Sequence, residues 1–163
     1  MSRRLVCIGL FTAWAVHDTE EVLTASRWSA RTSPRLLAEG CPPRLVDAIG
    51  SSTPQFALAA ALVGVAVLIA TIQGVRTGGD SEFFQAAVLV FGWHGAVHIA
   101  QALIVRDYIP GLATVFLLVI PYTLVARRVL GRPPVPPRRI TLVATVAVVL
   151  TVAAQSAARF LIP

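Results

Sequence analysis

Five long apolar stretches follow one another along the chain, separated by shorter polar segments. The last four are almost free of charged residues and contain about twenty residues each, the length at which an α-helix crosses the hydrocarbon core of a bilayer. The first begins with a dozen uncharged residues and becomes polar in its second half. This pattern predicts five membrane-spanning helices, over residues 5–26, 54–75, 82–105, 109–126 and 140–158.

Two of the polar segments are long. Residues 27–53 contain several arginines and prolines and are expected to form a polar outer loop, with a short helix from Pro43 to Ile49. Residues 127–139 are rich in proline and arginine and are expected to form an extended linker. We expect Ser81 to cap the third spanning helix and Pro121 to kink the fourth, because proline lacks a backbone N–H.

Composition supports a membrane protein. The 163 residues are 56% hydrophobic and 13% charged, whereas a soluble domain has about 25% charged residues. All fourteen basic residues are arginine, and the net charge is +6, but no nucleic-acid-binding motif accompanies this charge. We therefore expect a single all-α integral membrane domain over residues 1–163, whose arginines meet anionic lipid and not nucleic acid.

The distribution of arginine predicts an orientation. Five spans place the two termini on opposite sides, and eight of the fourteen arginines then lie on the N-terminal side. Because arginine-rich loops tend to stay in the cytoplasm, a cytoplasmic N-terminus is expected. A cleavable signal peptide is the other interpretation of the first apolar run, but that run leads directly into charged residues and no clear Ala-x-Ala cleavage site follows.

The most unusual stretch is His17-Asp18-Thr19-Glu20-Glu21, in the first predicted span. A charge at the centre of a bilayer costs about 2.5–3.5 kcal/mol or more, so such groups persist where they face a protein interior and have partners or a ligand. On a helix, His17, Glu20 and Glu21 share one face, and Asp18 points about a quarter-turn away.

A second polar stripe lies on the third predicted helix, where His94, His98 and Gln101 are spaced i, i+4 and i+7. With five spans, the first and third helices run in the same direction. His17 lies twelve residues after Leu5, and His94 twelve residues after Glu82, so both stripes reach about 18–24 Å into the membrane. We therefore expect them to face each other, with Gly92 and Gly95 permitting close approach of helices or leaving room for a ligand.

Three imidazoles with carboxylates are suitable ligands for a divalent metal, either zinc or iron. We expect His17, His94, His98 and Glu20 to bind the metal and Glu21 to act as a base, although the sequence does not separate the roles of the two glutamates. A metal-bound water has a lowered pKa and attacks esters, amides or phosphoesters. The default prediction is therefore a hydrolase that acts on a lipidic or isoprenoid substrate entering from the bilayer.

Two other functions remain open at this stage. A metal-free isomerase or terpenoid cyclase would move a proton with Glu21 or Asp18, and aromatic rings would stabilise a carbocation. A non-enzymatic proton-coupled carrier would use the same buried groups as a relay. The side chains expected to contact the substrate are Trp14, Trp93, Gln101 and Tyr108.

These motifs resemble a family of small bacterial integral membrane proteins named for its HXXEE motif. The resemblance covers about residues 10–28 and 90–125. It implies a multi-pass protein of the bacterial cell membrane and supports one site formed by both stripes, but it implies no reaction. A more distant likeness to sterol-isomerase-type folds rests on the spacing of His17 and Glu21 alone. The residues that carry the family resemblance are His17-Asp18-Thr19-Glu20-Glu21, Arg27-Trp28, His94-x-x-x-His98-Ile-x-Gln101, Arg106-Asp-Tyr108-Ile-Pro110-Gly111 and Pro121-Tyr122.

Overall fold

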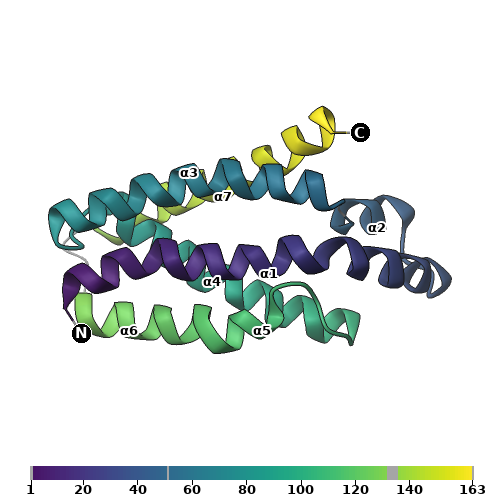
Figure 1. The fold of residues 1–163 in the computed structure, drawn as a ribbon, viewed down its shortest axis with the longest axis horizontal. Coiled ribbons are helices and arrows are strands. Elements are labelled where there is room, and N and C mark those ends of the chain that lie inside the picture. The colour runs from purple at the N-terminus through teal and green to yellow at the C-terminus, as the bar shows by residue number, and fades with distance from the viewer. Residues whose placement is uncertain (1, 51, 132–135, 163) are drawn as a thin grey trace.

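The computed structural model describes residues 2–50, 52–131 and 136–162, and within these ranges it contains helices and no strand. The long helices run alternately in opposite directions, and the two termini lie at opposite ends of the bundle (Figure 1). This confirms the predicted all-α bundle of about five long helices. The elements are α1 (Arg3–Ala38), α2 (Pro43–Ile49), α3 (Thr53–Thr77), α4 (Glu82–Val105), α5 (Leu112–Thr114), the π-helix η1 (Val115–Val119), α6 (Ile120–Leu130) and α7 (Pro137–Leu161).

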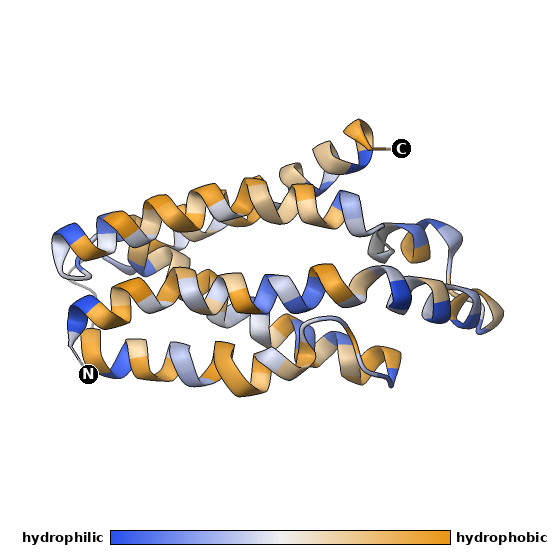
Figure 2. Cartoon of the chain, in the orientation of Figure 1, coloured by the Kyte–Doolittle hydropathy of each residue, from blue (hydrophilic) through white to orange (hydrophobic). Residues whose placement is uncertain are grey.

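Four of the long helices in the described ranges have the length and composition of membrane spans. They are α3, α4, the continuous helix Leu112–Leu130 and α7, consistent with a multi-pass membrane protein. The helix α1 differs because polar residues interrupt its apolar run midway along the bundle (Figure 2). Its carboxylates therefore require partners inside the protein.

The helix α1 is longer than the sequence predicted. It contains 36 residues and continues to Ala38, so residues 27–38 are helical and their prediction as loop was wrong. Its buried stripe continues through Trp28, Thr32 and Leu36, at the spacing of one helix face. Pro34 is tolerated because it lies on the exposed face. The short helix predicted from Pro43 to Ile49 is confirmed as α2.

The remaining boundaries lie close to the predicted ones. The helix α4 has the predicted limits, and the hydroxyl of Ser81 accepts a hydrogen bond from the Phe84 N–H, which confirms the predicted cap. The predicted linker 127–139 is shorter than expected, because α6 extends to Leu130 and α7 begins at Pro137. Its central part, residues 132–135, lies outside the described residues.

A π-helix, η1, ends two residues before Pro121, where the sequence predicts a kink. Proline removes the N–H that would bond the carbonyl four residues earlier, and a wider π-helical turn is one way in which a helix accommodates such a defect. The irregular turn follows Thr114 directly, and Thr114 contacts one of the predicted site histidines.

The apolar core fills the half of the bundle nearer the N-terminus. It brings together residues of α1, α4, η1 and α6, such as Leu10, Phe84, Phe91 and Val119. The Phe91 ring meets the His17 imidazole edge-on, with the ring centroids 6.0 Å apart. The core therefore ends where the polar stripes of α1 and α4 begin, and its apolar side chains pack directly against them.

Gly74→Ala is expected to lower the free energy of unfolding by about 1–3 kcal/mol, because the added methyl would overpack the core. A Cβ at Gly74 would lie 2.5 Å from Cδ2 and 2.6 Å from Cγ of the buried Phe84 ring. Unfolding in detergent micelles measures the effect. In a Gly74→Ala/Phe84→Leu double variant, the smaller side chain should relieve part of the loss, so purely additive losses would contradict this packing account.

Candidate metal centre

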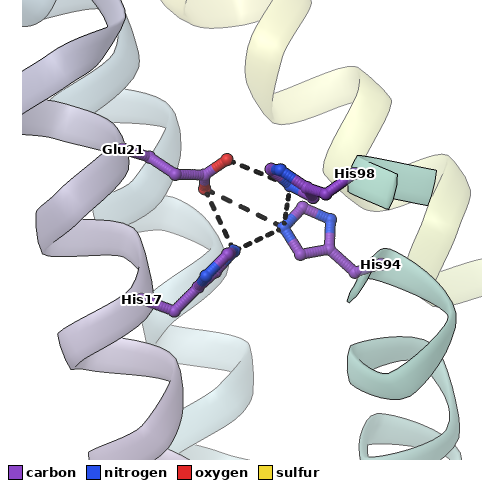
Figure 3. Close-up of side chains that lie close together, drawn as sticks. All are labelled: His17, Glu21, His94 and His98. Atoms are coloured by element: carbon purple, nitrogen blue, oxygen red, sulfur yellow. Dashed lines mark hydrogen bonds and ion pairs between the residues drawn. The ribbon is translucent and has the colours of Figure 1, made fainter. Parts of the chain in front are cut away.

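Four potential metal-binding side chains from two helices converge on one point. His17 and Glu21 extend from α1, and His94 and His98 extend toward them from α4 (Figure 3). One donor atom from each residue lies within 4.8 Å of all the others. The chain has three histidines in all, so this group contains every imidazole of the protein.

The distances within the group match the size of a small cation. The Nε2 atom of His94 lies 3.0 Å from His17 Nε2 and 2.9 Å from His98 Nε2. Glu21 Oε1 lies 3.2 Å from His98 Nε2, and Glu21 Oε2 lies 3.7 and 3.8 Å from the Nε2 atoms of His17 and His94. Neighbouring ligand atoms around a tetrahedral zinc ion with bonds of about 2.0–2.1 Å are about 3.3 Å apart. Small side-chain adjustments would therefore let all four groups bind one ion.

The group is closed on most sides. The side chains of His17, His98 and Glu21 are 0%, 6% and 8% exposed, whereas that of His94 is 39% exposed. A buried carboxylate requires charged or hydrogen-bonding partners, and these imidazoles are the groups nearest to it. Access from outside the protein is therefore through the edge that His94 forms.

The helix pattern explains why these residues meet. His17 and Glu21 continue the buried stripe of Leu10 and Ala13 on α1. On α4, glycines allow the neighbouring helix to approach: a Cβ at Gly92 would lie 2.8 Å from Thr123 Cγ2, and a Cβ at Gly95 would lie 3.1 Å from Val119 Cγ1. Gly92 and Gly95 thus have the predicted role of close helix approach.

The segment between α4 and α5 covers the donor group. Gly111 adopts a left-handed conformation with φ +81°, and a Cβ there would lie 2.7 Å from His17 Cε1, 3.0 Å from Glu21 Cγ and 3.2 Å from His98 Cε1. The Trp28 indole holds this segment by donating a hydrogen bond to the Tyr108 carbonyl at 2.7 Å. Glycine is thus required here both by backbone conformation and by space.

The two glutamates lie in different places. Glu21, predicted to be the base, belongs to the donor group, whereas Glu20, predicted to be a ligand, does not. The Glu20 carboxylate accepts hydrogen bonds from the N–H groups of Ala113 and Thr114, at 3.3 and 2.8 Å, and from the Tyr108 hydroxyl. Burial, together with the hydrogen bond to Glu20 and its negative charge, raises the pKa of Tyr108 to about 12, so its hydroxyl remains a donor.

The other predicted residues lie outside the donor group. Asp18 is half-buried on a neighbouring face of α1. The Trp14 ring packs against Gly64 of α3, where a Cβ would lie 2.4 Å from the indole. Trp93 is 66% exposed and Gln101 is exposed, so their expected contacts with substrate lie, at most, at the outer edge of the site.

Sequence reasoning missed two residues that contact the group, Gly111 and Thr114. Gly111 is among the residues that carry the family resemblance, but nothing in the pattern indicated that its segment folds back over His17. Thr114 carries no signal by itself, because threonine is common in apolar helices. Its hydroxyl oxygen lies 2.8 Å from His17 Nδ1.

These observations define a helical protein with membrane-span-like helices and a buried His/Glu donor group between two parallel helices. A family model described as "Protein of unknown function with HXXEE motif" matches residues 8–126. The chain therefore belongs to the HXXEE family, whose motif corresponds here to His17, Glu20 and Glu21. No curated protein matches the chain, and no solved structure matches it.

Proposed function

We propose that this protein is a metal-dependent membrane enzyme in which His17, His94 and His98 hold a divalent ion and Glu21 acts as the base. The observation that carries this proposal is the convergence of three Nε2 atoms and one buried carboxylate within 4.8 Å. Three imidazoles with an open fourth position are typical of catalytic zinc, and imidazoles with a carboxylate also suit iron.

Electrostatics favours a cation in this position. When the three imidazoles are neutral, the group carries one negative charge from Glu21, in surroundings that are largely closed to solvent. A divalent ion would compensate that charge, which is favourable at low dielectric. A bound ion would supply an activated water, and the Glu21 carboxylate, beside the imidazole nitrogens, would accept its proton.

The surroundings of the open edge favour a lipidic or isoprenoid substrate. Apolar side chains next to His94 face outward: Trp93 is 66% exposed and Val97 is 49% exposed. A bilayer-soluble molecule would therefore reach the exposed His94 edge from the hydrocarbon phase. A hollow of about 560 Å³ beside Tyr108, lined mainly by apolar surface with Arg27 and Arg31 among its residues, would suit an amphiphile. We place the enzyme in the bacterial cell membrane with a cytoplasmic N-terminus, as the arginine distribution favours.

Elemental analysis of protein purified in detergent without chelator tests the proposal. We expect about one equivalent of zinc or iron per chain, removed by dialysis against a chelator and restored by Zn²⁺ or Fe²⁺. A protein that contains no metal and takes up neither ion would overturn the metal-dependent enzyme. Metal-free turnover of an isoprenoid would then identify an acid/base isomerase or cyclase, and proton flux in proteoliposomes would identify a carrier.

A further inference from the structure

The family motif contains two adjacent glutamates whose side chains have different partners. Glu21 faces the imidazoles, whereas both carboxylate oxygens of Glu20 are engaged by the segment from Tyr108 to Thr114. The N–H groups of Ala113 and Thr114 belong to the first turn of the continuous helix Leu112–Leu130 and have no partner within that helix. A carboxylate at this end is also favoured by the helix dipole. Glu20 therefore fixes the start of this helix against α1.

Thr114 connects the same turn to the donor group. Its hydroxyl donates a hydrogen bond to the Gly111 carbonyl at 3.0 Å, and its oxygen lies 2.8 Å from His17 Nδ1. When the Thr114 hydroxyl proton points to the Gly111 carbonyl, which cannot donate, the contact with His17 requires Nδ1–H as the donor. In neutral His17, Nε2 then carries no proton, and its lone pair faces His94 Nε2 at 3.0 Å.

His17 is the imidazole whose Nδ1 contacts Thr114. The Nδ1 atom of His98 is buried and has no hydrogen-bond partner among the described residues. His17 is also the most deeply buried member of the group, with a side chain 0% exposed. Thr114 is thus positioned to set the tautomer of His17, and a correctly oriented ring with a free Nε2 is what a metal requires.

We propose that Glu20 is a positioning residue that acts through Thr114: it holds the first turn of α5 so that the Thr114 hydroxyl fixes the tautomer and orientation of His17. Glu20 is then not a ligand. Glu20, the first glutamate of the motif, orders the donor group, and Glu21, the second, belongs to it. This inference rests on the proposed metal site, but its consequence for the tautomer of His17 does not require a bound metal.

Thr114→Val, Thr114→Ser and Glu20→Gln test the proposal, with Thr19→Val as the matched control. Thr19 lies within the motif, but it is exposed, and its hydroxyl donates a hydrogen bond to the Ala15 carbonyl of its own helix, at 2.6 Å. Zn²⁺ affinity is measured by competition with a chromophoric chelator in detergent. Thr114→Val and Glu20→Gln should each weaken Zn²⁺ binding about 10–100-fold, the usual effect of losing such a partner. Thr114→Ser and Thr19→Val should remain close to the wild-type protein.

Nitrogen NMR of ¹⁵N-histidine-labelled protein shows which ring nitrogen carries the proton. A loss of packing alone would not move that proton from Nδ1 to Nε2. In metal-free wild-type protein, neutral His17 should carry its proton on Nδ1, and Thr114→Val should reduce that form whereas Thr114→Ser should retain it. Unchanged Zn²⁺ affinity and an unchanged tautomer in Thr114→Val would overturn the proposal, as would equal losses in the serine and valine variants. If the wild-type protein binds no metal, the metal-dependent enzyme fails, and the tautomer measurement alone decides the role of Thr114 and Glu20.

Discussion

His98→Ala is expected to lower the affinity of the protein for a divalent metal about a hundred- to a thousandfold. A structural zinc ion with four protein ligands is bound with about 10–16 kcal/mol, so one ligand of such a site accounts for about 2.5–4 kcal/mol, and 1.4 kcal/mol corresponds to a tenfold change. His98 Nε2 lies against both His94 and Glu21, at 2.9 and 3.2 Å. Because its side chain is 6% exposed, solvent has little access to the position of the lost ring. Competition with a chelator in detergent measures the change.

Gln101→Ala provides the control for this experiment. Gln101 lies three residues after His98 on the same helix, was expected from the sequence to contact the substrate, and is exposed in the structure. Its replacement should leave metal affinity unchanged. His94→Ala should weaken binding less than His98→Ala, since a water molecule can take the place of a ring that is 39% exposed. Equal affinities in the His98 and Gln101 variants would show that the imidazoles do not act together as ligands.

The position of the donor group could be predicted because it depends on regular helix geometry. His17 and Glu21 share one face of α1, and His94 and His98 share one face of α4, as their spacings require. The direction of each helix follows from the number of spans, and depth follows from the residue count along each one. These quantities are fixed by the chain itself, and the structure places the two stripes against each other, with 3.0 Å between the Nε2 atoms of His17 and His94.

The different positions of Glu20 and Glu21 could not be predicted in the same way. Neighbouring residues on a helix differ by about 100° in direction, so both glutamates could lie within the angular range of one polar face. Their partners are decided by the segment from Tyr108 to Thr114, which offers two N–H groups and a phenol to Glu20. The path of a turn between two helices depends on tertiary contacts, and hydrophobic periodicity carries no information about it.

The extension of α1 was missed for a related reason. Arginines and Pro34 indicated a loop, although Trp28, Thr32 and Leu36 repeat at the spacing of one helix face. A helix that projects beyond the apolar part of the bundle can be polar on most sides, and its one buried stripe is then the remaining signal. This stripe has a role in the site, because Trp28 holds the Tyr108 carbonyl and so the segment that covers the imidazoles.

Gly111→Ala is expected to disrupt the donor group without altering any of its four members. A methyl group at this position would lie 2.7 Å from the His17 ring and 3.0 Å from the Glu21 side chain, so these groups or the turn itself must move. A non-glycine residue at positive φ also costs about 1–2 kcal/mol. Ligand misplacement of this kind should weaken Zn²⁺ binding at least about tenfold, measured by the same chelator competition.

Gly78→Ala separates the steric effect of Gly111→Ala from the cost of its backbone conformation. Gly78 also has a left-handed conformation, with φ +62°, but a Cβ there would meet nothing within 4 Å. Both variants should lose similar conformational stability from the backbone, measured as a lower midpoint of thermal unfolding. Only Gly111→Ala should also lose affinity for Zn²⁺. Wild-type affinity in both variants would mean that the turn does not press on the imidazoles, and that the closeness of Gly111 to His17 and His98 has no part in binding.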